Sequence, residues 1–492
     1  MKKVFVALIS FGFLFTPLGI AKADEASIEK LLQRIEALEK RLSRYENAAQ
    51  QQDAPPKNAA QQNIPAQKTT ASFSNSTLSG DFVGFNHAYS YKVLDHAEDV
   101  TTKQLIQLNA INSGELNSRV TLGGQVTALM NFQKATRDSK FGWLMRHPTS
   151  ANQIGKEASE AVIHSANLNV TAQLGSNFIA YAEMLYNPEQ NFASDSTITG
   201  LPRNNVNMRR AYILYNGLED YNTYGSIGKM DIPFGLNDTV SPFTNSSVWH
   251  SFAGLAYGAT VGYVKNGWHT RFMAIQGGAQ FRNANTPVND TNVPSKLNNY
   301  AVDVNYTSEF KNGSWLTGAS YQHGSSYCQD YPVRHFNPCT DNNPAVSLYT
   351  KYNLKRTTII GEYAETLDEW PGTFNPAFPA YAGFEAQPNV SFGLGIKQGL
   401  DIGDFKDVYL SAEFGRFQAG ASGSPWEKQD QYVLGISYFP TVNVNLFGEY
   451  SLADGWVPLN FLSGGNPGPA FHESWSDQDA DTQVLTIGIQ AA

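Results

Sequence analysis

From about residue 77 to the C-terminus, the chain alternates apolar and polar residues in stretches of about ten, each of which ends at a turn. In one such stretch, Val120 and Met130 share one parity, whereas Thr121 and Asn131 have the other. Because successive side chains of a β-strand point to opposite faces, each stretch has one apolar and one polar face. Strands of this kind can close into a barrel with lipid outside and water inside. The pattern therefore predicts an all-β membrane protein, an antiparallel transmembrane β-barrel that encloses a pore.

The N-terminus indicates which membrane is involved. Two lysines precede an apolar run over residues 4–20, and the small residues at 21–23 match a signal-peptidase site, so we expect residues 1–23 to be a signal peptide. An uncleaved anchor helix is the alternative, but the run is short and contains Pro17 and Gly19. No later stretch approaches the roughly 18 to 20 apolar residues of a spanning helix. Export without such a helix is consistent with the cell outer membrane of a Gram-negative bacterium.

The composition agrees with a membrane barrel and argues against a protein that binds nucleic acid. Aromatic residues make up 12% of the chain, which suits the aromatic rims of a membrane barrel. The chain has 35 basic and 44 acidic residues, and three of the lysines lie in the predicted signal peptide, so the mature chain has a net charge near −12. Phosphate binding needs a basic surface, and nucleic acid is therefore not an expected partner.

A helical period follows the predicted cleavage site. Over residues 24–46, apolar residues recur three and four apart, which predicts a short periplasmic coiled coil that joins protomers into a homo-oligomer. A lone amphipathic helix is the alternative, and dimer and trimer both remain open. Residues 47–74 have no period and predict a flexible linker. The apolar positions of the helix are Ile28, Leu31, Ile35, Leu38, Leu42 and Tyr45.

Residues 75–492 are expected to form the barrel, in which short turns alternate with long polar loops. Asn-Gly at 266–267 and at 312–313 is the strongest hairpin signal available. Residues 77–90 and 105–112 could add a hairpin and make eighteen strands, although Leu105, Leu108 and Ile111 also fit one helical face. The sixteen clear strands are expected at 119–132, 161–174, 178–186, 205–216, 222–232, 257–265, 268–276, 299–309, 314–323, 345–353, 357–366, 389–399, 407–417, 430–439, 443–450 and 483–491.

The segment before the barrel also excludes one transport mechanism. An energised TonB-type receptor needs a folded plug of over a hundred residues ahead of its first strand. Only about fifty residues, the predicted helix and linker, precede the barrel here. We therefore expect a barrel without a plug built from this segment.

Charged strand residues are expected to face the lumen, because a charge on the lipid face near the membrane midplane costs roughly 2 to 4 kcal/mol. Such residues can simply hydrate the wall without binding a solute. A lumen lined by both positive and negative side chains suits the passage of a bulky polar solute, such as a carboxylate-rich chelate, better than the filtering of simple ions. The pore-lining candidates are Arg119, Glu183, Arg210, Lys229, Arg271, Asp303, Lys351, Glu362, Lys397, Glu413 and Glu449.

One loop is a candidate for narrowing the pore. Segment 236–256 follows a strand that ends in Pro-Phe-Gly and mixes aromatic with polar residues, of which Asp238, Trp249 and His250 are the constriction candidates. The alternative is that this loop packs over the rim of the barrel.

The remaining motifs point to a disulfide but not to a metal site or a catalytic site. Cys328 and Cys339 lie in one polar loop, and in an oxidising periplasm they most simply form a disulfide. The acidic run at 477–481 lacks the Gly and Glu of a calcium loop, so we expect no metal and no cofactor. The sequence has no HExxH, GxSxG or phosphate-binding motif, and we expect no enzymatic activity.

Taken together, a signal peptide, a short heptad helix, an Ala/Gln/Pro linker and a barrel with the motifs RRAY at 209–212 and GKMDIPFG at 228–235 resemble the LbtU family of siderophore porins. The resemblance implies uptake of a ferric siderophore, an iron-chelating small molecule, through a plugless barrel in outer-membrane lipid. The chain departs from most barrels in ending Ile489-Gln490-Ala491-Ala492 rather than in an aromatic residue. A passive porin for small anions or peptides, or an adhesive or envelope-tethering barrel, are the alternatives.

Overall fold

The computed structural model describes residues 82–136, 156–187, 205–276, 297–325, 327, 342–370, 384–424, 427–455 and 481–492. The predicted signal peptide, coiled coil and linker lie outside these residues, as do Cys328 and Cys339.

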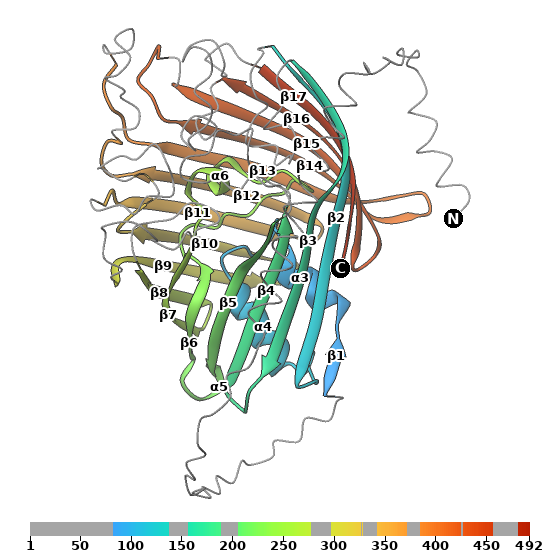
Figure 1. Cartoon of the computed structure of the whole chain (residues 1–492), viewed down its shortest axis with the longest axis vertical. Helices are drawn as coiled ribbons and strands as arrows, with labels where there is room; N and C mark the ends of the chain where they lie inside the picture. Colours follow the sequence, from blue (N-terminus) through green and yellow to red (C-terminus); the bar gives the residue numbers. More distant parts are fainter. Residues whose placement is uncertain are drawn as a thin grey trace, which may run out of the picture. The chain divides into compact units, whose positions relative to one another are not determined.

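Sixteen antiparallel strands of the described chain form a closed barrel (Figure 1). Each strand pairs with the next, and the last, β17, pairs with β2 and closes the wall. The predicted fold class is therefore confirmed, with a strand at each of the sixteen expected positions. The wall consists of β2 Val120–Ala135, β3 Glu157–Gln173, β4 Phe178–Asn187, β5 Asn205–Gly217, β6 Thr223–Asp231, β7 Leu255–Lys265, β8 Trp268–Gln276, β9 Leu297–Phe310, β10 Gly313–Gln322, β11 Ala345–Leu354, β12 Thr357–Thr366, β13 Val390–Ile402, β14 Phe405–Gln418, β15 Lys428–Thr441, β16 Val444–Gly455 and β17 Asp481–Ala491.

The eighteen-strand alternative is wrong. The two segments proposed for the extra hairpin form the helices α3 (His87–Leu94) and α4 (Lys103–Asn112) and only one short strand, β1 (Val83–Phe85). Asn86 starts α3, because its side chain accepts a hydrogen bond from the Tyr89 amide at 3.0 Å. Among the described residues, no helix has both the length and the apolar character needed to cross a membrane.

β1 covers an edge that the barrel leaves unpaired. The pairing of β17 with β2 stops at Val126, so the first residues of β2 extend past β17. β1 pairs in parallel with residues 120–122 in this position. The chain is thus attached to the wall immediately before α3.

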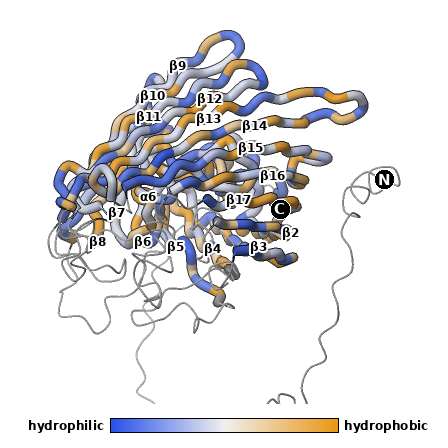
Figure 2. The backbone as a smooth tube through the Cα atoms, turned by 90° about the horizontal axis from the view of Figure 1, so that it is seen from above, coloured by the Kyte–Doolittle hydropathy of each residue, from blue (hydrophilic) through white to orange (hydrophobic). Residues whose placement is uncertain are grey.

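The two faces of the wall have opposite chemistry, as the alternation predicts. On the outer face, Val126, Met130 and Leu168 are 44%, 47% and 47% exposed. On the inner face, Asn131 and Asn169 are fully buried. Apolar and polar residues alternate along the strands in Figure 2. The barrel can therefore present hydrocarbon to lipid while enclosing polar side chains.

The connections differ in length at the two ends of the barrel. Tight turns join β3 to β4, β7 to β8 and β11 to β12 at one end, which we call the short-turn end. Asn266 and Gly267 have φ angles of 51° and 84°, as a two-residue type I′ hairpin requires. A single helical turn, α5 (Leu218–Tyr221), joins β5 to β6 at the same end. The residues between β6 and β7, which include α6 (Ser247–Phe252), belong to the opposite set of longer connections.

Candidate functional site

Two segments of the chain lie inside the barrel (Figure 1). The first, residues 86–116, contains α3 and α4, and we call it the luminal hairpin. The second, residues 232–254, connects β6 to β7 through α6, and we call it the inward loop. Both segments make their hydrogen bonds with inward-facing residues of the wall, as described below.

The luminal hairpin is attached to strands around most of the barrel. The hydroxyl of Tyr89 lies 2.7 Å from that of Thr171 on β3, and Tyr212 on β5 donates to Gln107 at 3.0 Å. The loop between α3 and α4 reaches β8, where Arg271 donates to the Thr101 carbonyl, and β13, where Lys397 pairs with Glu98. Tyr91 donates to Gln490 on β17 at 3.2 Å. The hairpin therefore spans the lumen from one side of the wall to the other.

Lys103 stabilises the turn between the two helices. Its ammonium donates to the carbonyls of Lys92, Asp95 and Glu98 at 3.1, 2.7 and 3.0 Å. The Lys92 carbonyl belongs to the last turn of α3, where carbonyls lack partners within the helix and a positive charge is favourable. Lys103 is only 2% exposed, and this burial lowers its pKa even though Asp95 opposes the shift.

One side of the lumen is filled by an apolar core. Tyr89 and Leu108 of the hairpin pack in one cluster with Tyr181 of β4 and with Tyr212 and Leu214 of β5. These wall residues face inward and are at most 4% exposed. Around Tyr181, Tyr212 and Leu214, the strands β4 and β5 are thus apolar on both faces, which is possible only because the hairpin covers the inner one.

The assignment of the segment directly after the linker needs a correction. Residues 75–118 were expected to belong to the barrel wall, whereas residues 86–116 contain two helices and lie in the lumen. The apolar run from Ala211 to Leu214 contained the missing information, because a strand that lines water should be polar on one face.

Three glutamates hold the inward loop against the opposite side of the wall. Glu362 on β12 accepts from the amides of Leu236 and Asn237, both at 2.8 Å. Glu413 on β14 accepts from the Val240 amide at 3.0 Å and from the Thr239 hydroxyl at 2.7 Å. Glu449 on β16 accepts from the amides of Phe243 and Thr244, both at 3.0 Å, and from the Thr244 hydroxyl. Alternate strands of the wall therefore bind successive parts of the loop.

Glycines on the intervening strands allow this close approach. A Cβ atom at Gly395 of β13 would lie 2.6 Å from Cγ2 of Val240. A Cβ atom at Gly435 of β15 would lie 2.4 Å from Cδ of Pro242. Real Cβ atoms are not found so close to other atoms, so any larger residue would push the loop away from the wall.

The hairpin and the inward loop are also bonded to each other. The Thr239 amide donates to the Ala97 carbonyl at 2.8 Å, and the Val100 amide donates to Asp238 at 3.2 Å. Lys351 on β11 lies 2.9 Å from Asp238 and 3.8 Å from Glu98. Burial raises the pKa of Glu98, but Lys397, Lys351 and Lys103 outweigh it and lower the value to about 2. Glu98 is therefore ionised under physiological conditions and joins the hairpin to the wall.

Most predicted lumen charges on the remaining strands form ion pairs within the wall. Arg210 binds Asp231 through two nitrogens at 2.5 and 2.8 Å and Glu183 through a third at 2.7 Å. Arg271 and Asp303 are paired at 2.8 Å. Lys229 donates to the Met208 carbonyl at 2.5 Å, whereas Arg119 is exposed just before β2.

The constriction candidates lie in the inward loop but are packed rather than open to solvent. Asp238 is 2% exposed and His250 is fully buried. Trp249 packs edge-on against His250, with ring centroids 5.1 Å apart.

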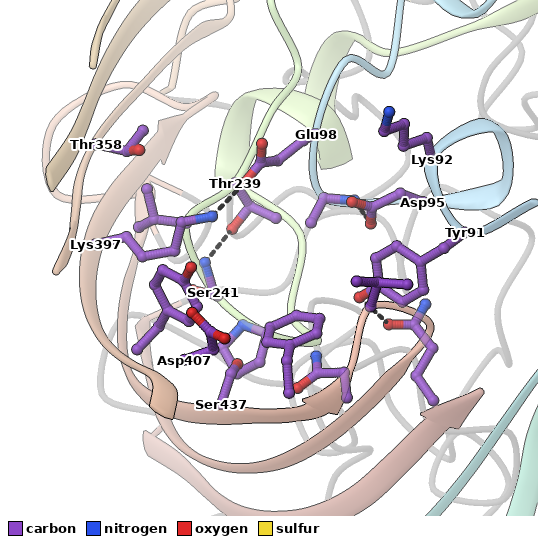
Figure 3. A pocket seen from close by; sticks show the side chains of 18 of the residues that line it. Tyr91, Lys92, Asp95, Glu98, Thr239, Ser241, Thr358, Lys397, Asp407 and Ser437 are labelled. Carbon is purple, nitrogen blue, oxygen red and sulfur yellow. Dashed lines mark hydrogen bonds and ion pairs between the residues drawn. The ribbon is translucent and has the colours of Figure 1, made fainter. Parts of the chain in front are cut away.

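A cavity of about 780 Å³ remains between the two segments and the wall (Figure 3). It reaches the short-turn end, where Arg356 lies in the turn between β11 and β12 and Asp407 lies near the start of β14. Of the pore-lining candidates, Lys397 borders this cavity, and the constriction candidates do not. Sequence reasoning missed the other lining residues. The signal that could have found two of them is an aromatic residue at an inward strand position, as at Tyr409 on β14 and Phe439 on β15. The remaining missed residues include Tyr91, Glu98, Thr239, Ser241, Arg356 and Gln490.

The described residues hold no group of three or more His, Cys, Asp or Glu that is arranged to bind a metal ion.

No family model matches the chain, and no curated protein matches it. Solved structures similar to it include the anion-selective porin from Comamonas acidovorans, with 12% identity, a TM-score of 0.45 and coverage of 76% of this chain and 99% of that chain. OprB of Pseudomonas putida has 9% identity, a TM-score of 0.46 and coverage of 75% and 94%. OmpF of Salmonella typhi has 12% identity, a TM-score of 0.44 and coverage of 75% and 97%. Likeness at this level carries no argument about function, and the barrel assignment rests on the strand pairing itself.

Proposed function

We propose that this protein is an outer-membrane channel of the porin type that takes up a specific bulky polar solute, with a ferric siderophore as the first candidate. The observation that carries the proposal is the partly filled lumen. A wall with an apolar outer face encloses two anchored segments, which leave a cavity of about 780 Å³. Such a lumen is narrower than the water-filled pore that a bare sixteen-strand barrel encloses, and this favours selective passage over general diffusion.

The siderophore is proposed from the resemblance to the LbtU family and from the mixed charge of the lumen. The cavity is bordered by basic residues such as Arg356 and Lys397 and by acidic residues such as Glu98 and Asp407. A chelate with several polar groups can use both signs, whereas a simple ion filter needs one. The luminal hairpin, residues 86–116, is far shorter than the plug of an energised receptor, which supports uptake without TonB coupling.

Growth of a deletion strain under iron limitation tests whether the solute is a ferric siderophore. If the channel carries a siderophore, the deletion strain should grow slowly only when iron is scarce. Complementation should restore its growth, and it should do so also in a background that lacks TonB. Equal growth of deletion and parent strains in scarce iron, with a chelate supplied, would exclude this solute.

Liposome swelling by the purified protein separates the alternatives. A selective channel admits few of a series of sugars, amino acids and peptides of similar size. A passive porin for small anions or peptides admits many, and an adhesive or envelope-tethering barrel admits none.

We also propose that residues 24–46 join protomers into a homo-oligomer in the periplasm. Their apolar residues recur three and four apart, and the rest of the segment is rich in Glu, Lys and Arg. Cross-linking of the full-length protein and of a variant without these residues tests this proposal, since only the former should give oligomers.

A further inference from the structure

The cavity beside the luminal hairpin has a composition that points to one class of solute. The hairpin fills the side of the lumen next to β4 and β5, and the space left lies next to β13–β17 (Figure 3). Three inward-facing rings border it. Phe439 lies between Tyr91 and Tyr409, with centroids 5.9 Å from each, and meets both rings edge to face. Tyr409 and Phe439 lie on wall strands and Tyr91 lies on α3, so the three rings form an aromatic group in a cavity whose other lining residues are mostly polar or charged.

Two cations flank the same aromatic residue. The Arg356 guanidinium carbon lies 5.5 Å from the Tyr409 ring centroid, and the Lys397 ammonium lies 5.8 Å from it. Both distances are within the range of cation–π interactions. This arrangement places positive charge next to a ring face that borders the cavity.

The acidic partners of Arg356 are exposed and therefore exchangeable. Arg356 pairs with Asp401 at 2.7 Å and with Asp407 at 3.4 Å, and these carboxylate side chains are 48% and 60% exposed. Exposed ion pairs are weak, so a carboxylate of an entering solute can replace an acidic side chain at little cost. Lys397 keeps Glu98 as its partner, because Glu98 also pairs with Lys351, and Lys397 can donate its remaining ammonium hydrogens to a solute. Weak, exchangeable binding is what transport needs, because the solute must also leave.

Two further cations border the cavity. The side chains of Lys92 and Lys355 are exposed and line it. Within the described ranges of the chain, neither forms an ion pair with an acidic residue. The cavity is also lined by four acidic residues of the described chain, of which Glu98, Asp99 and Asp407 form ion pairs with basic residues. Lys92 and Lys355 are therefore cations that can bind an anionic solute without displacing an acidic side chain.

We propose that this cavity is the solute-binding site of the channel and that it takes anions that carry a planar ring, with the ring on Tyr91, Tyr409 and Phe439 and the oxyanions at Lys397 and Arg356. The inference rests on the proposed channel function and names the solute class. Stacking gives preference for the ring, and the two cations give preference for the charge.

Block of ion current in planar bilayers tests this inference on the full-length protein. Benzene-1,3,5-tricarboxylate carries a ring and three carboxylates, citrate carries the charge without the ring, and inositol carries neither charge nor aromatic face. We expect the aromatic anion to half-block the current at about a tenfold lower concentration than citrate, with little block by inositol.

Variants identify the groups responsible. Tyr409→Leu should remove the preference for the aromatic anion and leave citrate unchanged, whereas Lys397→Gln and Arg356→Gln should weaken block by both anions. Tyr432→Leu on the outer face of β15, and Lys134→Gln, whose side chain is 72% exposed, are the matched controls.

Each outcome has a distinct meaning. Equal half-blocking concentrations for the three probes, or unchanged block in all three cavity variants, would overturn the inference and leave the channel intact. Absence of any current from correctly folded protein would overturn the proposed function itself.

Discussion

Replacing one of the three loop-anchoring glutamates should release part of the inward loop without unfolding the barrel. Glu449 is the best choice, because it accepts hydrogen bonds from the Phe243 and Thr244 amides and from the Thr244 hydroxyl and is only 2% exposed. In Glu449→Gln the amide oxygen can still accept from both backbone amides and the amide nitrogen can donate to the Thr244 hydroxyl, but the negative charge that strengthens all three bonds is lost.

The magnitude follows from these bonds. A hydrogen bond to a charged group contributes about 1.5 to 3 kcal/mol, and contributions of neighbouring bonds are not additive. We therefore expect a loss of about 3 kcal/mol from loop attachment, which raises the ratio of detached to attached loop roughly a hundredfold. The strand pairing of β16 with β15 and β17 is backbone bonding and stays unchanged.

Single-channel recording measures this effect as increased open-channel noise and larger conductance steps. The matched control is Glu365→Gln, since Glu365 lies outside the loop contacts and, among the residues that the structure describes, its carboxylate accepts only from the exposed Tyr363 hydroxyl at 2.6 Å. A disulfide between positions 247 and 415 provides a rescue, because a Cβ at Gly415 would lie 2.8 Å from Cβ of Ser247. A disulfide has a mean Cβ–Cβ distance of about 3.8 Å, so the loop must move by about 1 Å away from the wall at this position for the bond to form.

The rescue is made in a Cys328→Ser, Cys339→Ser background. Oxidation should suppress the added noise of Glu449→Gln, and reduction should restore it. Noise and conductance equal to those of the control, in both redox states, would refute the anchoring role of the glutamates.

Three further outcomes follow from the buried charges. Lys103→Met removes three hydrogen bonds to hairpin carbonyls and should speed hydrogen exchange in α3 at least tenfold, without change in the wall strands. Arg210→Ala leaves two carboxylates without their main partner and should lower the free energy of unfolding in urea by about 3 to 5 kcal/mol, whereas Lys134→Ala, at a pair 72% and 74% exposed, should change it by less than about 1 kcal/mol. Because the pKa of Glu98 falls to about 2 in the folded protein, its stabilising contribution is complete above its ordinary value of 4.5 and is lost as the pH falls from there towards 2. Hydrogen exchange at residues 95–102, corrected for intrinsic rates, should therefore show less protection at pH 3 than at pH 6, and Glu98→Gln should lack this contribution at both.

The sequence predicts the wall in detail because a barrel strand depends on local information. Period-two alternation assigns Val126 and Met130 to lipid and Asn131 to the lumen, and the structure agrees. Turn residues with positive φ, such as Asn266 and Gly267, mark the ends of strands. A slip of one residue would turn every apolar side chain inward, so the register is strongly determined.

The interior of the barrel is harder to predict, because it depends on contacts between residues far apart in the chain. Alternation correctly identified Glu362, Glu413 and Glu449 as charged residues on strands, but it could not show that they bind the amides of a loop more than a hundred residues away. The same limit applied to Glu98 and Lys397, which lie 299 positions apart.

The sequence by itself therefore determined the positions of the sixteen long strands and which face of each meets lipid, because both follow from the alternation of neighbouring side chains. The structure excluded the eighteen-strand alternative, because residues 87–94 and 103–112 form helices. Only the tertiary structure decided what occupies the lumen. Closing the wall brings β4 and β5 over α3 and α4, so that Tyr181 and Leu214 become core residues. Most of the predicted lumen charges bind the luminal hairpin, the inward loop or another charge of the wall, because a buried charge is stabilised by pairing with polar neighbours when it cannot face water.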